Sequence, residues 1–231
     1  MAPELEPDEA LKIKAAEVFR RLLALYGRPD WRQPLPALDE LICTILSQNT
    51  NDRNRDVAFQ ALRTRLPSWE QVRDAPAQDV VEAIRPAGLA NQKGPRIQAV
   101  LRQITAERGA LDLGFLADIP QGEALAWLLK FKGVGPKTAA IVLQFSLGRP
   151  AFPVDTHIQR VSGRLGLRPL KMTVEQSHRF LARLFPPQDY GPAHLNLILL
   201  GRQVCHARRP DCPHCPLTDL CRYYIEEVRA A

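Results

Sequence analysis

Apolar residues recur every three to four positions along most of the chain, which is the spacing of amphipathic helices. Alternation with period two is hard to find, so the pattern predicts an all-α fold. In the first helix the apolar face consists of Leu11, Ala15, Val18, Leu22 and Leu25. The predicted helices cover residues 10–26, 37–48, 52–66, 69–74, 77–85, 94–108, 121–129, 137–147, 156–165, 174–184 and 190–203.

Two proline-rich stretches interrupt this pattern. "GRPDWRQPLP", residues 27–36, contains three prolines and predicts a linker, because proline removes backbone donors that helices and sheets require. "GRPAFPV", residues 148–154, predicts an extended segment between two helices. The helix at 37–48 is apolar almost throughout, so we expect it to be buried.

The chain is basic as well as helical. Its 231 residues are 45% hydrophobic, which is enough for one large core or two small ones. The formal net charge is +6, and residues 156–231 carry eleven basic and six acidic side chains. This excess favours a polyanionic partner. No secretory signal or long apolar run is present, so we expect a soluble, cytoplasmic protein without a membrane partner or disulfides.

A glycine-bracketed loop, "FKGVGPKTA", precedes the helix at 137–147. A nucleotide-binding loop needs glycine directly before its lysine, and here Pro136 separates Gly135 from Lys137. Gly133 and Gly135 permit positive φ and close approach, and proline suits the first helical turn. The free N–H groups of that turn would face a phosphate. The loop therefore predicts a helix-hairpin-helix that grips DNA, with a simple helical corner as the alternative.

Asp155 heads the helix that follows the extended segment. That segment is long enough to bring the chain back to the end of the helix where Lys137 lies. Asp155 is expected to cap its helix, and an ionised carboxylate near Lys137 would stabilise a developing cation. The simpler interpretation of Lys137 is a lysine that contacts phosphate or solvent.

Four cysteines follow a C-x6-C-x2-C-x5-C pattern at Cys205, Cys212, Cys215 and Cys221. Four thiolates so close together in a reducing compartment predict a metal site, with zinc and iron–sulfur both open from spacing. The fifth cysteine, Cys43, lies in an apolar run and is expected in the core. Arg208 and Arg209 lie between the first two ligands, where they either contact phosphate or remain solvated.

The sequence "GVGPKTA", with an Asp eighteen residues after its lysine in "VDTHIQRV", resembles the helix-hairpin-helix DNA glycosylase superfamily. The resemblance is closest to the endonuclease III branch and extends from about Ala10 to Tyr224. It implies that Lys137 is the nucleophile, that Asp155 is the essential carboxylate, and that the four cysteines ligate a 4Fe-4S cluster. It also implies two lobes with the active site between them. Residues 35–155 would form a six-helix barrel, and residues 1–34 with 156–231 a discontinuous cluster domain.

The implied activity is that of a bifunctional DNA glycosylase and AP lyase of base excision repair. It would remove oxidised pyrimidines and cleave the strand by β-elimination through a lysine Schiff base. Its partner would be double-stranded DNA with damaged bases or abasic sites, bound by a monomer at the nucleoid of a prokaryotic-type cell. Adenine mismatch glycosylases, a sister branch, carry a Glu in the helix equivalent to Leu41–Ser47, which has no carboxylate here. That branch, a non-catalytic DNA-binding module and a zinc-stapled interaction protein remain alternatives.

The resemblance also indicates which residues contact DNA. The polar turn "SQNTND" offers Gln48 and Asn49 to fill the gap left by an extruded base, and the register points to Asn49. Leu89, in the turn "AGLANQKG", resembles the family's wedge between bases, unless it folds back into the core. The other predicted DNA contacts are Lys93, Gly133, Val134, Gly135, Thr138, His157, Arg208 and Arg209.

Overall fold

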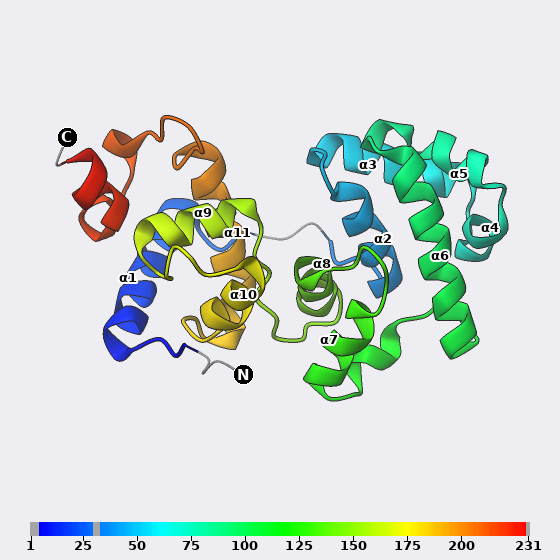
Figure 1. Cartoon of the computed structure of the whole chain (residues 1–231), viewed down its shortest axis with the longest axis horizontal. Coiled ribbons are helices and arrows are strands. Elements are labelled where there is room, and N and C mark those ends of the chain that lie inside the picture. Colours follow the sequence, from blue (N-terminus) through cyan, green and yellow to red (C-terminus); the bar gives the residue numbers. More distant parts are fainter. Residues whose placement is uncertain (1–4, 30–32, 230–231) are drawn as a thin grey trace. The chain divides into compact units, whose positions relative to one another are not determined.

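The computed structural model describes residues 5–29 and 33–229, and every regular element in these ranges is a helix (Figure 1). The all-α prediction is therefore confirmed. Backbone contacts divide the chain into two compact units, one made of Pro34–Arg149 and the other of residues 1–33 with 150–231. Asp155 belongs to the discontinuous unit. The predicted linker at 27–36 includes residues 30–32, which lie outside the described residues.

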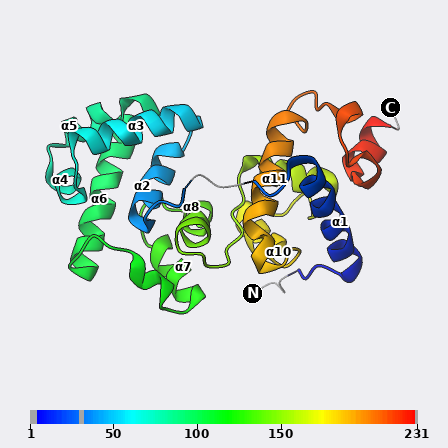
Figure 2. The same ribbon diagram turned by 180° about the vertical axis from the view of Figure 1, so that it is seen from behind.

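The discontinuous unit joins an N-terminal helix to the C-terminal third of the chain. Helix α11 packs against both α1 and α9, so segments far apart in sequence lie side by side (Figures 1 and 2). Its α-helices are α1 (Glu9–Tyr26), α9 (Thr156–Leu165), α10 (Val174–Ala182) and α11 (Tyr190–Gln203), with short helical turns at Pro187–Asp189, Cys212–His214, Thr218–Leu220 and Tyr224–Val228.

The core of this unit is aromatic where α1 meets the other helices. Phe152 stacks on Phe185 with ring centroids 5.3 Å apart, and Phe19 meets Phe185 edge-on. The predicted face of α1 is wrong at one position, because Leu25 is 51% exposed. Leu25 lies in the last turn of α1, where the buried face has already ended at Leu22.

The continuous unit is built around α2. This helix packs against α3, α6 and α8, and Leu41, Ile42 and Ile45 have no exposed surface. The prediction of a buried helix here is confirmed. The α-helices of this unit are α2 (Ala37–Ser47), α3 (Asp52–Arg65), α4 (Trp69–Asp74), α5 (Ala77–Ala83), α6 (Ala90–Arg108), α7 (Gln121–Leu129) and α8 (Pro136–Ile141), with short helical turns at Arg85–Ala87 and Gly114–Ala117 and a π-helical turn at Val142–Ser146.

Two predicted helices differ from the observed ones by more than two residues at one end. Helix α6 begins at Ala90, one turn before the predicted start, and Gly94 and Pro95 lie inside it. A Cβ at Gly94 would lie 2.9 Å from Cγ2 of Val81, so this glycine allows α5 to approach α6 closely. The predicted helix at 137–147 is α-helical only to Ile141 and then widens, with the N–H of Leu147 bonded to the carbonyl of Val142 at 3.3 Å.

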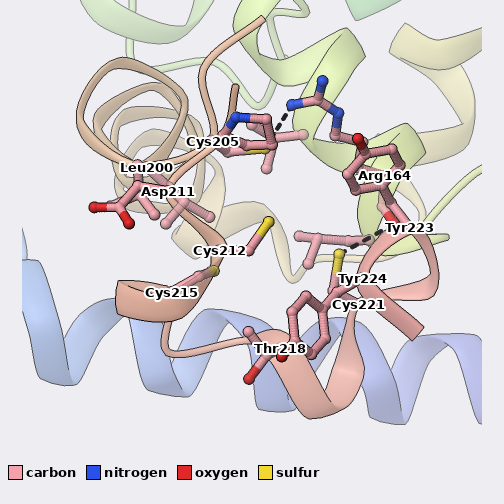
Figure 3. Close-up of a pocket in the computed structure, with 14 residues that line it drawn as sticks. Arg164, Leu200, Cys205, Asp211, Cys212, Cys215, Thr218, Cys221, Tyr223 and Tyr224 are labelled. Carbon is pink, nitrogen blue, oxygen red and sulfur yellow. Dashed lines mark hydrogen bonds between the residues drawn. The ribbon is translucent and has the colours of Figure 1, made fainter. Parts of the chain in front are cut away.

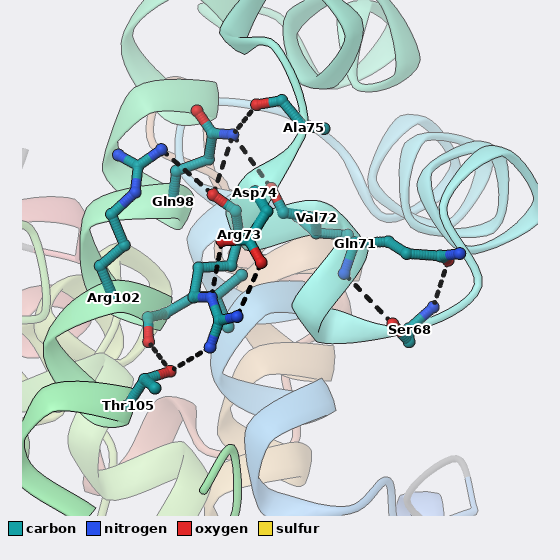
Figure 4. Close-up of polar contacts among 10 residues, drawn as sticks. Ser68, Gln71, Val72, Arg73, Asp74, Ala75, Gln98, Arg102 and Thr105 are labelled. Atoms are coloured by element: carbon teal, nitrogen blue, oxygen red, sulfur yellow. Dashed lines mark hydrogen bonds and ion pairs between the residues drawn. The ribbon is translucent and has the colours of Figure 1, made fainter. Parts of the chain in front are cut away.

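Helix α4 is fixed at both ends by side chains (Figure 4). Ser68 and Gln71 form a reciprocal capping box at its start. At its end the amide of Gln98, on α6, donates to the carbonyls of Val72 and Ala75 at 3.0 and 2.8 Å. Across the described ranges no helix is both long and apolar enough to cross a lipid bilayer.

Candidate functional site

The loop between α7 and α8 has the backbone of a helical hairpin. Gly133 has a φ of +86°, which favours glycine, and Pro136 occupies the first turn of α8. Gly135 is extended with a φ of −96°, so it does not use the positive φ that glycine permits. A Cβ at Gly135 would meet nothing within 4 Å, so its backbone is open to a close ligand.

The backbone N–H groups of this loop differ in whether they already have a hydrogen-bond partner within the protein. The N–H of Val134 donates to the carbonyl of Phe131 at 3.0 Å, and its side chain is buried. Neither the N–H nor the side chain of Val134 is free for the predicted DNA contact, which stays a prediction. The carbonyl of Gly135 accepts the first helical bond, from Ala139 at 3.0 Å. Lys137 and Thr138 occupy the first turn, where N–H groups have no partner within a helix.

Lys137 is half-buried in the first turn of α8. Within the described part of its own unit, its ammonium has neither a hydrogen-bond nor an ion-pair partner. Asp155 lies in the other unit, so the predicted approach of these two side chains stays a prediction. An unpaired lysine beside a glycine hairpin is able to accept a new partner without first breaking an internal contact.

The turn after α2 is tied to the hairpin by Gln48. Its Nε2 donates to the carbonyl of Gly133 at 3.0 Å, and its Oε1 accepts from Nη1 of Arg96 at 3.1 Å. The Arg96 side chain also lies over Gly133, where a Cβ would collide with it. Because both ends of the Gln48 amide are engaged, Gln48 is less available than its neighbour to enter DNA.

Asn49 and Leu89 are exposed, and both have a left-handed backbone. Their φ angles are 54° and 51°, a region that few residues other than glycine adopt. Leu89 is 47% exposed, so it does not fold back into the core. A strained backbone that holds an apolar side chain in solvent is typical of functional positions. Both placements are compatible with their predicted roles, which stay predictions.

Lys93 does not lie at the surface, and its predicted contact with DNA is wrong. Its side chain is 1% exposed, and Nζ donates to the carbonyls of Leu46 and Ala87 at 2.7 and 2.8 Å. Burial lowers the pKa of this ammonium, and the charge of Arg96 adds to the effect. No local pattern predicts this burial, because the turn around Leu89 is otherwise polar and Gly94 resembles the start of a helix.

Asp155 is the N-cap of α9, as predicted. Its Oδ1 accepts from the N–H of Ile158 at 2.8 Å, and its backbone is extended. His157 follows in the first turn and is half-buried, with Nδ1 at 3.0 Å from Nη2 of Arg160. One ring nitrogen of His157 is thus engaged within the protein, so any DNA contact falls to the other.

Two arginines of α9 that the sequence did not single out connect this helix to the cysteine loop. Arg160 donates to the carbonyls of Cys205 and Gly201 at 2.9 and 2.8 Å. Arg164 donates to Sγ of Cys205 at 3.4 Å and to the carbonyls of His206 and Ala207. The only sequence feature that points to this role is the spacing of the two arginines. They are four residues, or about one helical turn, apart on the helix that Asp155 caps.

The four cysteines line one pocket (Figure 3), together with apolar side chains such as Leu200 and Val161. Burial raises the pKa of Cys212, Cys215 and Cys221, in the case of Cys215 to about 11, and neighbouring thiolates add to each shift. Thiolates held this close need a positive charge among them. In the ranges that the structure describes, no three His, Cys, Asp or Glu side chains converge on a site for a single metal ion. A donor set of four sulfurs is compatible with a tetrahedral zinc ion and with an iron–sulfur cluster.

Arg208 and Arg209 are exposed on the loop between Cys205 and Cys212. Neither forms an ion pair with a carboxylate of the described residues. Arg209 has a φ of 51°, and Arg164 holds the backbone of this loop through the carbonyls of His206 and Ala207. The two charges are therefore presented on a fixed loop. Cys43, by contrast, is 1% exposed in α2, as predicted.

Comparison with known proteins agrees with this arrangement. The family described as "HhH-GPD superfamily base excision DNA repair protein" matches residues 42–187. Endonuclease III of Thermotoga maritima is 34% identical over 184 residues, which are 80% of this chain and 82% of the relative. Two solved structures, "Structure of a non-covalent Endonuclease III-DNA Complex" and "Structure of a Trapped Endonuclease III-DNA Covalent Intermediate: Estranged-Adenine Complex", each align with a TM-score of 0.82 and 26% identity. Each alignment covers 94% of this chain, and 98% and 99% of the respective structures. The chain thus belongs to the HhH-GPD superfamily of base excision DNA repair proteins, as an endonuclease III-like DNA glycosylase.

Proposed function

We propose that this glycosylase is bifunctional: it removes oxidised pyrimidines from duplex DNA and then cleaves the strand 3′ to the abasic site. The observation that carries the proposal is Lys137, which lies in the first turn of the hairpin's second helix and has no hydrogen-bond or ion-pair partner among the described residues of its own unit. A relative 26% identical to this chain has been trapped as a covalent intermediate with DNA, which supports covalent chemistry in this branch. Helix α2 carries no carboxylate between Leu41 and Ser47, which speaks against the adenine-specific branch.

Lys137 acts as the neutral amine. Its Nζ attacks C1′ of an extruded nucleotide, and the glycosidic bond breaks with the electron pair leaving on the base. The nitrogen then gives one of its two protons to the departed base. Its lone pair opens the sugar ring, O4′ takes up a proton from solvent, and a protonated Schiff base results between Nζ and C1′. Asp155 stabilises the cationic sugar through its negative charge.

The Schiff base makes the C2′ proton acidic. Loss of that proton gives an enamine. As the C3′–O bond breaks, a C2′–C3′ double bond forms in conjugation with the C1′ imine, and the phosphate leaves with the bonding pair. Water then hydrolyses the Schiff base and frees Lys137. No diffusible cofactor enters any of these steps.

Cys205, Cys212, Cys215 and Cys221 are the proposed ligands of a 4Fe-4S cluster. The pocket that these four side chains line supports this assignment, as does the sulfur-only donor set. When bound, the cluster supplies positive charge to four thiolates and pins the loop that carries Arg208 and Arg209. The double-stranded DNA partner is supported by the endonuclease III–DNA complexes that align with the chain.

Borohydride trapping on a duplex that contains an oxidised pyrimidine tests the lysine assignment. Wild-type protein is expected to form a covalent adduct, and Lys137→Ala is expected to form none. Lys132→Ala is the matched control, because Lys132 is an exposed lysine of the same hairpin loop. Trapping of Lys137→Ala at wild-type yield would show that another amine is the nucleophile.

A further inference from the structure

Lys93 is a buried ammonium whose two acceptors lie at the ends of different helices. Leu46 is in the last turn of α2, and Ala87 ends the short helical turn Arg85–Ala87. The last carbonyls of a helix have no partner within it, and a buried charge is stable only where it is fully hydrogen-bonded. The single Nζ of Lys93 satisfies a carbonyl from each helix end.

Each of the two carbonyls lies two or three residues before one of the exposed left-handed residues. Leu46 precedes Asn49 by three residues, and Ala87 precedes Leu89 by two. The left-handed backbone at Asn49 and Leu89 makes each of these turns tight. Lys93 therefore connects the starting points of two protein turns. One turn presents the predicted gap-filling residue, and the other presents the predicted wedge.

Arg96, one turn further along α6, holds a third loop. It donates to Oε1 of Gln48 at 3.1 Å, and Nε2 of Gln48 donates to the carbonyl of Gly133 at 3.0 Å. Because Gly133 has no Cβ, the Arg96 side chain can lie against it; a Cβ there would collide with Cδ of Arg96. Lys93 and Arg96 are three residues apart and thus neighbours on the surface of α6. One helix therefore holds the turn after α2, the Leu89 turn and the hairpin.

We propose that Lys93 and Arg96 are positioning residues for base extrusion, which hold Asn49, Leu89 and the hairpin at the spacing that a distorted duplex requires. This inference rests on the proposed function and adds to it the residues that set the geometry of the DNA-facing loops. Neither side chain touches the reacting atoms. Successive base pairs are only about 3.4 Å apart, so a loop displaced by about 1 Å would place its side chain badly between them.

Gln98 provides a control for a merely structural role. It lies on the same helix, is 2% exposed, and donates to the carbonyls of Val72, Arg73 and Ala75 (Figure 4). Like Lys93, it is a buried donor that joins α6 to neighbouring backbone. It holds the end of α4, however, and none of the three loops above. Loss of Gln98 should lower stability without moving those loops.

The experiment compares Lys93→Met and Gln98→Met with the wild type in two assays. The first is the ratio of excision from a lesion-bearing duplex to cleavage of an abasic site in a single-stranded oligonucleotide, which needs no wedge. The second is 2-aminopurine fluorescence next to the lesion, measured in the Lys137→Ala background so that no bond is broken. Melting temperatures are measured in parallel.

Lys93→Met is expected to reduce the duplex-to-single-strand ratio by about 10- to 100-fold and to reduce the extrusion signal. Gln98→Met should keep both near wild type, even at a similar loss of melting temperature. If Lys93→Met does not fold, Arg96→Met tests the other arm, because Arg96 is only half-buried. Equal ratios for Lys93→Met and Gln98→Met, or for Arg96→Met and wild type, would overturn the proposal. A wild-type protein that extrudes the base but cleaves neither substrate would refute the proposed function and not the positioning role.

Discussion

Arg164 donates a hydrogen bond to the sulfur of Cys205 at 3.4 Å across 41 residues of sequence, and its carbonyl accepts one from Sγ of Cys221 at 3.4 Å. The guanidinium also lies 4.8 Å from the centre of the Tyr223 ring. A cationic donor next to a metal-ligating thiolate stabilises its negative charge. Arg164 thus contacts two of the four proposed ligands from a single position on α9.

We expect Arg164→Met to make the proposed cluster more labile. Methionine keeps most of the volume but removes the charge and the hydrogen bonds to Cys205, His206 and Ala207. The visible absorption of the iron–sulfur centre should decay several-fold faster in air, since second-shell changes typically cost about 10- to 100-fold in metal affinity. Iron and sulfide content per chain is the second measurement.

Arg179→Met is the control for that experiment, because Arg179 is an exposed arginine of the same unit whose ion pair with Glu175 lies within α10. It should lose its visible absorption at the wild-type rate. Equal decay of the Arg164 and Arg179 variants would remove Arg164 from the support of the cluster.

Substitutions of Asp155 separate its capping role from its proposed role in catalysis. Asn caps helices about as well as Asp, so Asp155→Asn should fold with near wild-type stability. Because the charge is gone, base excision should fall by about 100-fold or more, while affinity for undamaged duplex persists. Asp155→Ala should in addition lose about 1 kcal/mol of unfolding free energy. Excision by Asp155→Asn at the wild-type rate would show that the carboxylate is needed only as a cap.

Most helices could be predicted because their signals are local. The capping residues Asp8, Asn51, Ser68, Asp155 and Thr173 all accept a backbone N–H of the first turn, and the apolar periods between caps specify the buried faces. The start of α6 was misplaced because Gly94 and Pro95 resemble a helix boundary, whereas the chain uses that glycine for contact with Val81. A contact across two helices leaves no mark in the local pattern.

The residues of the candidate site also fall into two groups, those with a local sequence pattern and those without one. The hairpin, the cap at Asp155 and the cysteine spacing were visible because each is a short pattern with its own chemistry. The sequence analysis assigned the wrong role to Lys93 and did not identify Arg96 or Arg164. The partners of these three side chains are a backbone carbonyl, a side-chain amide and a sulfur, all far away in sequence. Every residue has a backbone carbonyl, so the sequence does not indicate which carbonyl will accept a hydrogen bond from a distant side chain.

A surface network joins α1 to the segment that carries the cysteines. Arg21 donates to both carboxylate oxygens of Asp219, at 2.6 and 2.9 Å, and to Glu17 at 2.7 Å. The guanidinium groups of Arg20 and Arg21 lower the pKa of Glu17 from 4.5 to about 2, and Arg21 lowers the pKa of Asp219. In the folded state these carboxyl groups bind protons less readily than in the unfolded state.

The network should therefore stabilise the fold fully above about pH 5 and progressively less as the pH falls from 4.5 towards about 2, where Glu17 titrates in the folded protein. We expect Arg21→Met to lower the melting temperature at pH 7 and to differ less from wild type at pH 3. The effect should be modest and should shrink in high salt, because the groups are exposed. Arg20→Met, which loses only the pair with Glu17, should show a smaller decrease. A deficit for Arg21→Met that is the same at both pH values would exclude the electrostatic origin.

The last prediction concerns Arg208 and Arg209, exposed on the loop that Arg164 supports. If each neutralises one phosphate, the slope of log affinity against log salt includes about −0.9 from each. The double variant Arg208→Ala with Arg209→Asn should flatten that slope by about 1 to 2 units. Asn is chosen at 209 because it tolerates the φ of 51° better than Ala does. Fluorescence anisotropy over a salt series, on damaged and undamaged duplex, provides the measurement.

Both duplexes should lose affinity alike, and their ratio should change little, because phosphate contacts position a protein without reading the base. Arg179→Met serves again as the control, since it removes an exposed charge of the same unit on α10 and should leave the slope unchanged. Visible absorption of the double variant shows whether the proposed cluster is retained, so that loss of the loop is not mistaken for loss of two charges. An unchanged slope in a cluster-containing variant would leave both arginines as solvated charges. A change in the lesion ratio would instead mean that this loop takes part in reading the damage.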